Sequence, residues 1–459
     1  MGVGLVGTQS RRRGRGRSWF WLALLPPVTA CAVYSPAPLS GLADATLRVP
    51  DLPAVAREAA ALSHPRLKPV AIDLSRPLTP EALGLIAVIA NPDLKAARAK
   101  AKVAAAQVFA AGLLPDPSIT LGIDQILAGP DHIDPLIAQL GLDVAAFRDR
   151  SVALEAARAS RSQARLDLAW QEWQTAGQAR LLAARIAGLS LVAAIDKDTQ
   201  ATAEAMLSRV LAAAARGDVK ADEVEVRRLA AADAADKARQ AERDLGAARL
   251  DLNKLLGLRP ETPIDIAAAS PPQTPLDAEA LFGRARTGRL DLKALEAGYT
   301  SQEAAVRKAV LDQFPSLQLT LSRARDTTGN QTLGPSVNFT LPLWNRNRGG
   351  IAIAEATRDQ LRNEYAARVY STRADIAALV EALRIEHRQR SEIAAQVGPL
   401  ADLVSAADAA ARRGDLAQAT AQSFRQSAAD KRLTLASLDQ TIAEQTVALE
   451  LAVGEPLTP

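Results

Sequence analysis

Residues 79–121 read TPEALGLIAVIANPDLKAARAKAKVAAAQVFAAGLLPDPSITL, and residues 277–319 read DAEALFGRARTGRLDLKALEAGYTSQEAAVRKAVLDQFPSLQL. The two stretches align without a gap at a constant offset of 198 and share the tetrapeptide Asp-Leu-Lys-Ala. A second match follows at offset 197, where Arg216-Gly217-Asp218 corresponds to Arg413-Gly414-Asp415. Two copies of so long a unit indicate a duplicated architecture rather than two unrelated domains.

Each copy contains the same series of expected elements. Thr79 and Pro80 predict a helix start, with Thr as the N-cap and Pro in the first helical position, and Asp277 takes the place of Thr79 in the second copy. After this helical stretch we expect strands at about 118–125, 138–145, 316–324 and 335–343. Long and shorter helices follow at about 151–216, 218–256, 348–412 and 415–453. The predicted fold is mostly α with a small β part, built from a duplicated helix-strand-strand-long helix-helix unit.

The expected strands alternate between apolar and polar residues. Leu317, Leu319 and Leu321 are separated by Gln318 and Thr320, and the other strands follow the same rule. Such alternation is typical of a half-buried hairpin on a soluble sheet, or of a strand that crosses a membrane in a tilted barrel. We find no apolar run of membrane length, so any membrane crossing would have to be a barrel. Two strands per copy cannot close one, which means that several subunits would have to contribute strands.

The expected shorter helices carry a heptad pattern. The rows at seven-residue spacing are Val224, Ala231, Ala238, Leu245 and Leu252 in the first copy and Ala421, Ala428, Leu435, Ile442 and Leu449 in the second. Alanine at such positions lets neighbouring helices approach closely. Aromatic residues make up only 3% of the chain, which favours closely packed long helices over a thick globular core.

The first 31 residues predict export. Five arginines precede a short apolar stretch from Trp19 to Ala30, which ends in the run Val28-Thr29-Ala30-Cys31. This order resembles a bacterial lipobox and predicts a lipoprotein signal peptide over residues 1–30, with Cys31 as the lipidated first residue. The alternatives are an ordinary signal peptide with an incidental cysteine, or a basic nucleic-acid patch. We interpret residues 31–78, which are rich in proline, as an extended N-terminal segment.

Charge and composition exclude several classes of function. Five of the 55 Lys and Arg residues lie in residues 1–30, where there are no acids, leaving 50 basic against 51 acidic residues. The mature chain is nearly neutral, so we expect no nucleic-acid partner. His64, His132 and His387 lie far apart and lack metal-ligand spacing. We therefore expect no metal site, no cofactor and no catalytic residues, and the protein is not predicted to be an enzyme.

Specific segments carry a resemblance to a known family. They are Asn91–Arg98, Ala111–Ser118, Leu341–Gly350 and the paired Arg-Gly-Asp turns. These segments, the order of elements and the duplication resemble the TolC-type outer-membrane efflux protein family over roughly residues 79–454. The chain is most similar to outer-membrane lipoprotein components of heavy-metal efflux systems of the RND type.

The resemblance implies an assembly and a function. It implies a homotrimer whose subunits contribute four strands each to a shared β-barrel, which continues as an α-helical tunnel through the periplasm. The implied partners are a periplasmic adaptor protein, an inner-membrane RND-type pump and outer-membrane lipid. The predicted function is an outer-membrane exit duct that conducts heavy-metal cations passively. Multidrug efflux and type I protein secretion are the alternatives within this class, and a soluble periplasmic coiled-coil adaptor is the alternative from another.

The resemblance also assigns roles to particular residues. The adaptor-contact tips are the two turns Arg216-Gly217-Asp218 and Arg413-Gly414-Asp415, and Asp222 and Glu223 match an acidic gate, although they also fit a solvated helix face. The second copy has Ala419 and Thr420 at the positions that match the acids. The barrel-to-tunnel hinge comprises Pro342, Trp344, Asn345, Arg346, Gly349 and Gly350, whereas the first copy lacks the Pro and Gly-Gly. Repeat 1 is predicted to span residues 79–275 and repeat 2 residues 276–454.

Overall fold

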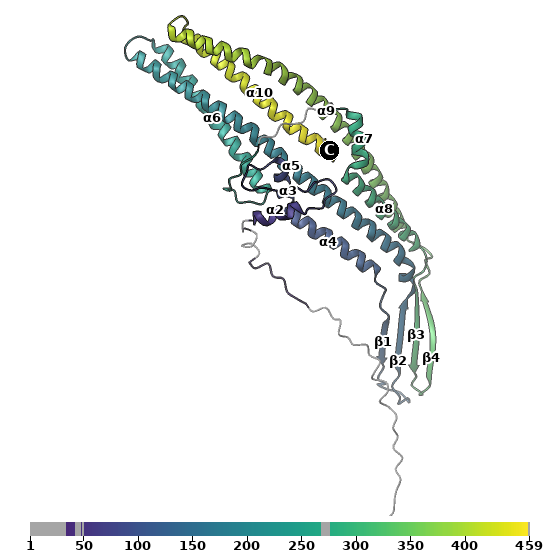
Figure 1. Cartoon of the computed structure of the whole chain (residues 1–459). Coiled ribbons are helices and arrows are strands. Elements are labelled where there is room, and N and C mark those ends of the chain that lie inside the picture. The colour runs from purple at the N-terminus through teal and green to yellow at the C-terminus, as the bar shows by residue number, and fades with distance from the viewer. Residues whose placement is uncertain (1–33, 42–46, 48–49, 268–275, 458–459) are drawn as a thin grey trace, which may run out of the picture. The chain divides into compact units, whose positions relative to one another are not determined.

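A computed structural model describes residues 34–41, 47, 50–267 and 276–457 of the chain (Figure 1). The helices and strands discussed below all lie within the unit Val49–Pro459. The predicted signal peptide and Cys31 lie outside the described residues.

The second unit is mostly helical, with one small sheet, as the sequence predicts. An N-terminal helix, α2 (Leu52–Ala60), precedes the two repeats. The first repeat contains α3 (Pro80–Ala90), α4 (Pro92–Gly112), β1 (Ser118–Ile123), β2 (Leu136–Asp143), α5 (Val144–Ala214) and α6 (Ala221–Leu255). The second contains α7 (Ala278–Gly288), α8 (Leu290–Leu311), β3 (Leu317–Arg325), β4 (Gln331–Phe339), α9 (Arg348–Arg413) and α10 (Gln418–Val453). The same six elements therefore occur twice in the same order.

Three elements differ from the sequence-based boundaries. Helix α5 begins at Val144, directly after β2, because the Asp143 side chain accepts hydrogen bonds from the first helical N–H groups. Strand β4 begins at Gln331 because residues 326–330 form a tight turn, and Pro335 is tolerated within this edge strand. Helix α2 lies in the segment interpreted as extended, so that interpretation is wrong for these residues.

The first helices of repeat 1 are short because of their capping residues. Thr79 accepts a hydrogen bond from Ala82 N at 3.2 Å and caps α3, and Pro80 occupies its first turn. Asn91 then ends α3 and caps α4 through a bond from Leu94 N at 3.0 Å. Two helices therefore meet at Asn91 at an angle that a single continuous helix would not allow.

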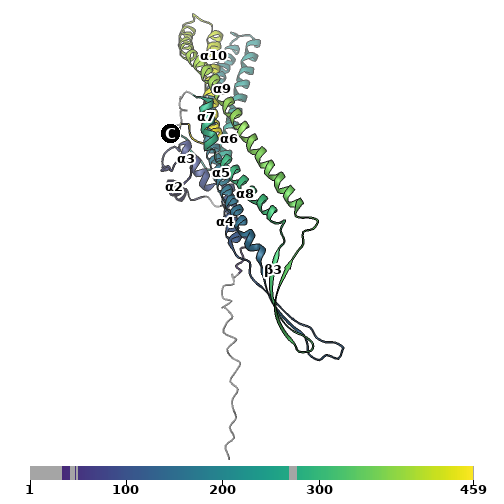
Figure 2. The same cartoon turned by 90° about the vertical axis from the view of Figure 1, so that its right-hand side faces the viewer.

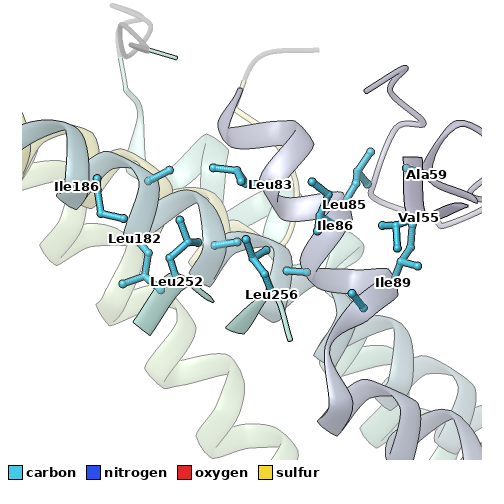
Figure 3. Close-up of a cluster of buried hydrophobic side chains, with 14 of the residues drawn as sticks. Val55, Ala59, Leu83, Leu85, Ile86, Ile89, Leu182, Ile186, Leu252 and Leu256 are labelled. Carbon is cyan, nitrogen blue, oxygen red and sulfur yellow. The ribbon is translucent and has the colours of Figure 1, made fainter. Parts of the chain in front are cut away.

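A hydrophobic core forms where α2, α3, α5 and α6 meet (Figure 3). Its largest side chains are Leu83, Ile86, Leu182, Ile186, Leu252 and Leu256, all at most 5% exposed. Helix α3 is apolar on all sides because α2 covers the surface that α5 and α6 leave free. Each fully buried leucine or isoleucine contributes about 1.5–3 kcal/mol relative to an exposed one.

The second repeat has an equivalent core between α7, α9 and α10. It contains Leu281, Ala285, Ile376, Leu383, Ile442, Leu449 and Val453. Several of these residues lie at the repeat offset from members of the first core, such as Leu281 from Leu83 and Leu449 from Leu252. The duplication is thus visible in the packing as well as in the sequence.

Helix α5 is the longest element, with 71 residues, and extends roughly 105 Å at about 1.5 Å per residue. Contrary to the expectation that no apolar run of membrane length exists, part of α5 is apolar and long enough to span a bilayer by composition alone. This helix packs against α3, α4, α6, α8 and α10. Its Arg180 and Arg185 also form ion pairs with Glu450 and Glu444 of α10. Helix α5 therefore connects the two repeats through packing and ion pairs.

Candidate functional site: a two-faced sheet and paired helix turns

The four strands form one antiparallel sheet in the order β1-β2-β3-β4. The pairing of β2 with β3 joins the two repeats, and it sets Leu140 opposite Leu321 and Leu142 opposite Leu319. Within repeat 1 Ile119 lies opposite Leu140. Residues that lie directly opposite each other project from the same face of a sheet. The register therefore aligns the apolar residues of all four strands.

One face of the sheet is almost continuously apolar. Its members are Ile119, Leu121, Ile123, Leu136, Ala138, Leu140, Leu142, Leu317, Leu319, Leu321, Leu333, Pro335, Val337 and Phe339. Many of these side chains are strongly exposed, for example Leu121 at 77% and Leu333 at 71%. Such an area exceeds what soluble monomers normally leave uncovered and marks a surface that contacts lipid or protein.

The opposite face is mostly polar. It carries Ser118, Thr120, Gln139, Gln318, Thr320, Ser322, Thr332, Ser336 and Asn338, together with small residues such as Gly141. Figure 2 shows that the sheet is a twisted ribbon with no helix packed across either face. Among the described residues, β1 pairs only with β2 and β4 only with β3, so both outer edges are open.

The segment from Leu341 to Gly350 connects β4 to α9 through an unusual backbone. Arg346 and Asn347 both have positive φ angles, 45° and 50°, which non-glycine residues rarely adopt. The Asn347 amide donates a hydrogen bond to Ala309 O of α8 at 2.9 Å, which fixes the turn to the neighbouring helix. A side chain at Gly350 would collide with Asn347. Gly350, the second glycine of the pair, therefore leaves room for the Asn347 side chain.

The remaining hinge residues line the same turn. Pro342 is half-buried, and the Asn345 carbonyl accepts a hydrogen bond from Arg348 N at 3.0 Å. Trp344 is 85% exposed, and Arg346 is also exposed. The sequence-predicted hinge residues thus form one compact turn at the base of the sheet.

The turn between α5 and α6 is built on Gly217. Gly217 has φ +81°, a left-handed conformation that glycine adopts without strain. Asp218 N donates to Ala213 O at 3.0 Å, which closes the helix end. Arg216 and Asp218 form an ion pair at 2.9 Å across the glycine, and both side chains are exposed.

The turn between α9 and α10 repeats this geometry. Gly414 has φ +84°, Asp415 N donates to Ala410 O at 2.9 Å, and Arg413 pairs with Asp415 at 2.8 Å. Small apolar clusters support the two turns: Met206, Val210 and Val224 under the first, and Ala407, Ala411 and Ala421 under the second. Helices α5 and α9 thus each run from the sheet at one end to one of these turns at the other.

Asp222 and Glu223 lie in the first turn of α6, close to the first of these turns. Both are exposed, and their negative charge also suits the helix N-terminus. The first turn of α10 contains no acidic residue and includes Ala419 and Thr420. The structure thus places an acidic pair beside one turn of the subunit and not beside the other.

Sequence reasoning missed the residues that tie the helix ends together. Asn91 donates to Leu255 O of α6 at 2.9 Å, and Arg289, at the repeat offset, donates to Ala452 O of α10 at 2.7 Å. Arg289 also makes a bidentate ion pair with the buried Asp291 and lies over the Trp170 ring at 4.8 Å from its centroid. The sequence offered one hint of these contacts: positions 91 and 289 correspond in the two repeats, and each holds a polar residue, Asn in the first and Arg in the second.

A second group that was missed lies in the segment before α3. His64 Nδ1 accepts hydrogen bonds from Arg66 N and Leu67 N, and His64 Nε2 contacts Ala169 O of α5, each at 3.0 Å. Burial lowers the pKa of His64 below 6.5 despite Glu172 at 3.7 Å. Arg66 forms an ion pair with Glu455 at 2.6 Å. This segment therefore contacts both repeats.

The three histidines are possible metal ligands by residue type. Within the described ranges, no group of three or more His, Cys, Asp and Glu side chains is placed to hold a metal ion. His132 is exposed, and His387 lines a cavity of about 520 Å³ between α5, α9 and α10.

The comparison with protein families gives one match. Residues 281–455 match the family described as outer membrane efflux protein. The second repeat is thus similar in sequence to this family. The matched residues include β3, β4, the Leu341–Gly350 turn, α9 and α10. No curated protein matches the sequence significantly.

Solved structures extend the likeness to the fold of the whole chain. The outer membrane protein VceC from Vibrio cholerae has 16% sequence identity and a TM-score of 0.67, over 82% of this chain and 96% of its own. CusC has 17% identity and a TM-score of 0.67, over 82% and 92% respectively. The outer-membrane channel OprN has 19% identity and a TM-score of 0.67, over 88% and 96%. This chain therefore shares its fold with these three outer-membrane proteins over most of its length.

Proposed function

We propose that this protein is the outer-membrane exit duct of a tripartite efflux system and that its cargo is heavy-metal cations. Three copies form one channel, with the sheets in the membrane and the helices in the periplasm. The duct conducts passively, and an inner-membrane pump of the RND type supplies the energy. Recognition of the cargo lies with the pump.

The two-faced sheet is the observation that carries this proposal. Its apolar face suits lipid and its polar face suits a water-filled lumen. A strand edge cannot remain unpaired in lipid, because its N–H and C=O groups would lack hydrogen-bond partners. Pairing β4 of one subunit with β1 of the next removes every edge and gives a closed barrel. A soluble coiled-coil adaptor has no use for such a sheet.

The long helices supply the periplasmic part of the duct. Helices α5 and α9 carry the chain roughly 100 Å from the sheet, at about 1.5 Å per residue. Their far ends present the two exposed Arg-Gly-Asp turns, where a periplasmic adaptor docks. Asp222 and Glu223 beside the first turn become a ring of six carboxylates in a trimer, which attracts cations.

Assembly and location are tested on the purified protein. We expect extraction from membranes only with detergent, and a trimer that resists mild denaturant and dissociates on heating. Recovery of a detergent-independent, soluble protein would instead favour the periplasmic adaptor class.

The cargo assignment is supported by the resemblance of the chain to the outer-membrane components of heavy-metal efflux systems, and it is tested by growth. We expect deletion of the gene to sensitise cells to zinc, cobalt, cadmium, nickel or copper, and expect the intact gene to restore resistance. Sensitivity to drugs alone would move the protein to multidrug efflux. A defect in a secreted protein without either sensitivity would favour type I secretion.

The N-terminus provides a second attachment to the membrane. In this proposal the signal peptide is removed and Cys31 carries a thioether-linked diacylglyceride, which adds to the insertion of the barrel. Replacing Cys31 by Ser should abolish metabolic labelling with a radioactive fatty acid, while the trimer still forms. Unchanged labelling would show that the cysteine is incidental.

A further inference from the structure

Two arginines interrupt the apolar face of the sheet near its loop end. Arg323 and Arg325 lie on β3, and the register places them on the same face as Leu319 and Leu321. Both side chains are exposed. Arg323 lies between Ala138 and Leu333, which are apolar, so its guanidinium projects from an otherwise lipid-compatible surface.

The charges of these arginines are not neutralised by the neighbouring residues. Arg323 donates a hydrogen bond to the Gln331 amide oxygen at 3.0 Å, and Arg325 donates to the backbone oxygen of Asp134 at 2.9 Å. Both acceptors are uncharged. The carboxylate of Asp326 is occupied by its own turn, where it accepts bonds from Thr328 and Asn330. Within the described part of the chain, the polar partners of Arg323 and Arg325 are therefore uncharged groups.

This arrangement favours a bound anion. Residues two apart on one face of a strand have Cα atoms only about 7 Å apart, so the two positive charges repel each other. An anion between them removes that repulsion. Each guanidinium carries five N–H donors and uses one in the contacts above, and its forked geometry suits the oxygens of a phosphate group.

The position of the arginines along the sheet identifies where the anion comes from. On this face of β3 and β4 the apolar residues end at Leu321 and Leu333, and the remaining positions toward the loop hold Arg323, Arg325 and Gln331. In an inserted barrel the apolar band ends at the level of the lipid headgroups. The two arginines therefore lie at that boundary, on the loop side of the sheet.

We propose that Arg323 and Arg325 bind the phosphate group of a membrane lipid headgroup in the leaflet at the loop end of the sheet. This inference rests on the proposed function, since only an inserted barrel places this face against lipid. The first repeat has Gln125 and Leu127 at the matching positions, so each subunit carries one such site.

The test begins with the wild-type trimer in nanodiscs of digalactosyl diacylglycerol, a lipid without phosphate. These contain small amounts of bisphosphorylated lipid A, its monophosphoryl form or a dephosphorylated form, and native mass spectrometry counts the lipids retained by the released trimer. We expect retention of up to three bisphosphorylated molecules, less of the monophosphoryl form and none of the dephosphorylated form. Equal retention of all three would overturn the inference.

The variants assign binding to the two arginines. Arg323→Gln with Arg325→Gln should lower retention of the bisphosphorylated lipid about tenfold or more, as two charge-assisted donors are lost. The matched control, Arg228→Gln with Arg239→Gln, changes the charge equally on the exposed surface of α6 and should leave retention unchanged. Equal retention by both double variants would refute the assignment.

Insertion is measured separately by flotation of the protein with phosphatidylcholine vesicles. Failure of the wild-type protein to float would refute the proposed function itself. If the wild-type protein floats but retains phosphorylated and dephosphorylated lipid equally, only the inference about Arg323 and Arg325 is refuted. Displacement of the lipid by millimolar inorganic phosphate would show a site for free phosphate and would also refute a lipid site.

Discussion

Substituting Arg289 by Ala should destabilise the protein far more than substituting Asn91, its counterpart in the first repeat. Each residue donates a hydrogen bond to the carbonyl end of the last helix of its repeat, at 2.7 Å and 2.9 Å respectively. Arg289 additionally neutralises Asp291, with both side chains only 8% exposed. The two residues therefore make the same kind of hydrogen bond to a helix end, but only Arg289 also belongs to a buried ion pair.

The magnitudes follow from these contacts. Removing one partner of a buried ion pair costs about 3–5 kcal/mol, because the other charge stays buried. Loss of a helix cap with one further hydrogen bond costs about 1–2 kcal/mol, which applies to Asn91→Ala. For roughly 400 folded residues, 1 kcal/mol shifts Tm by about 1.2 °C. We expect a decrease in Tm of about 4–6 °C for Arg289→Ala and about 1–2 °C for Asn91→Ala.

Thermal unfolding of the detergent-solubilised protein, followed by circular dichroism at the helix signal, measures both shifts. Replacing Arg289 by Met together with Asp291 by Leu should recover most of the loss, because no buried charge remains unpaired. The other partner of Asp291, Arg368 at 3.3 Å, is 44% exposed and can stay solvated. A decrease in Tm for Arg289→Ala no larger than that for Asn91→Ala would refute the reasoning.

Four other substitutions or conditions test the remaining features. Leu319→Arg should block membrane insertion, because an arginine on the lipid face costs about 2–4 kcal/mol. The Thr320→Arg variant, with its arginine on the polar face, should still insert. Equal flotation of the two variants with vesicles would contradict the assignment of the faces. Asp222→Ala with Glu223→Ala should lower the cation preference of single channels in planar bilayers, and unchanged selectivity would leave these acids as a solvated helix face. Gly217→Val with Gly414→Val should weaken co-purification of the adaptor, because valine strains a φ above +80°, while trimer formation serves as the control. Burial lowers the folded pKa of His64, so the stability that neutral His64 gives to its segment is complete above pH 6.5 and is lost as the pH falls through the folded pKa. Proteolysis within residues 61–78 should therefore rise as the pH is lowered below 6.5, and His64→Gln should remove that dependence.

Much of this fold can be predicted from local patterns. The strands can be recognised because apolar and polar residues alternate within short stretches such as Leu317 to Ser322, so no distant contact is needed to see the pattern. The shorter helices were recognisable from their heptads, and the turns between helices from Gly217 and Gly414. The element order was then fixed by the duplication, since each copy supports the interpretation of the other.

Features that depend on distant parts of the chain could not be predicted in this way. Asp93 and Asp291 belong to the same repeated tetrapeptide, yet Asp93 is exposed and Asp291 is buried against Arg289 and Arg368. Helix α2 was missed because prolines surround it, although Asp51 caps it and Pro53 lies in its first turn, where proline is tolerated. Gly217 and Gly414 lie in turns between helices, as their residue type suggests, but the hydrogen-bond partners of Asn91 and Arg289 were not foreseeable.

The open edges of the sheet have a consequence for how the channel is made. A single subunit carries two unpaired strands and an uncovered apolar face, which is the surface that promotes aggregation in water. The helical hairpins have their own buried cores and can fold before the subunits meet. In the proposed trimer the sheet, in contrast, would reach its final form only when the last subunit joins, so assembly would depend on subunit concentration. Until then the uncovered apolar face and the open edges would have to be kept from non-specific association.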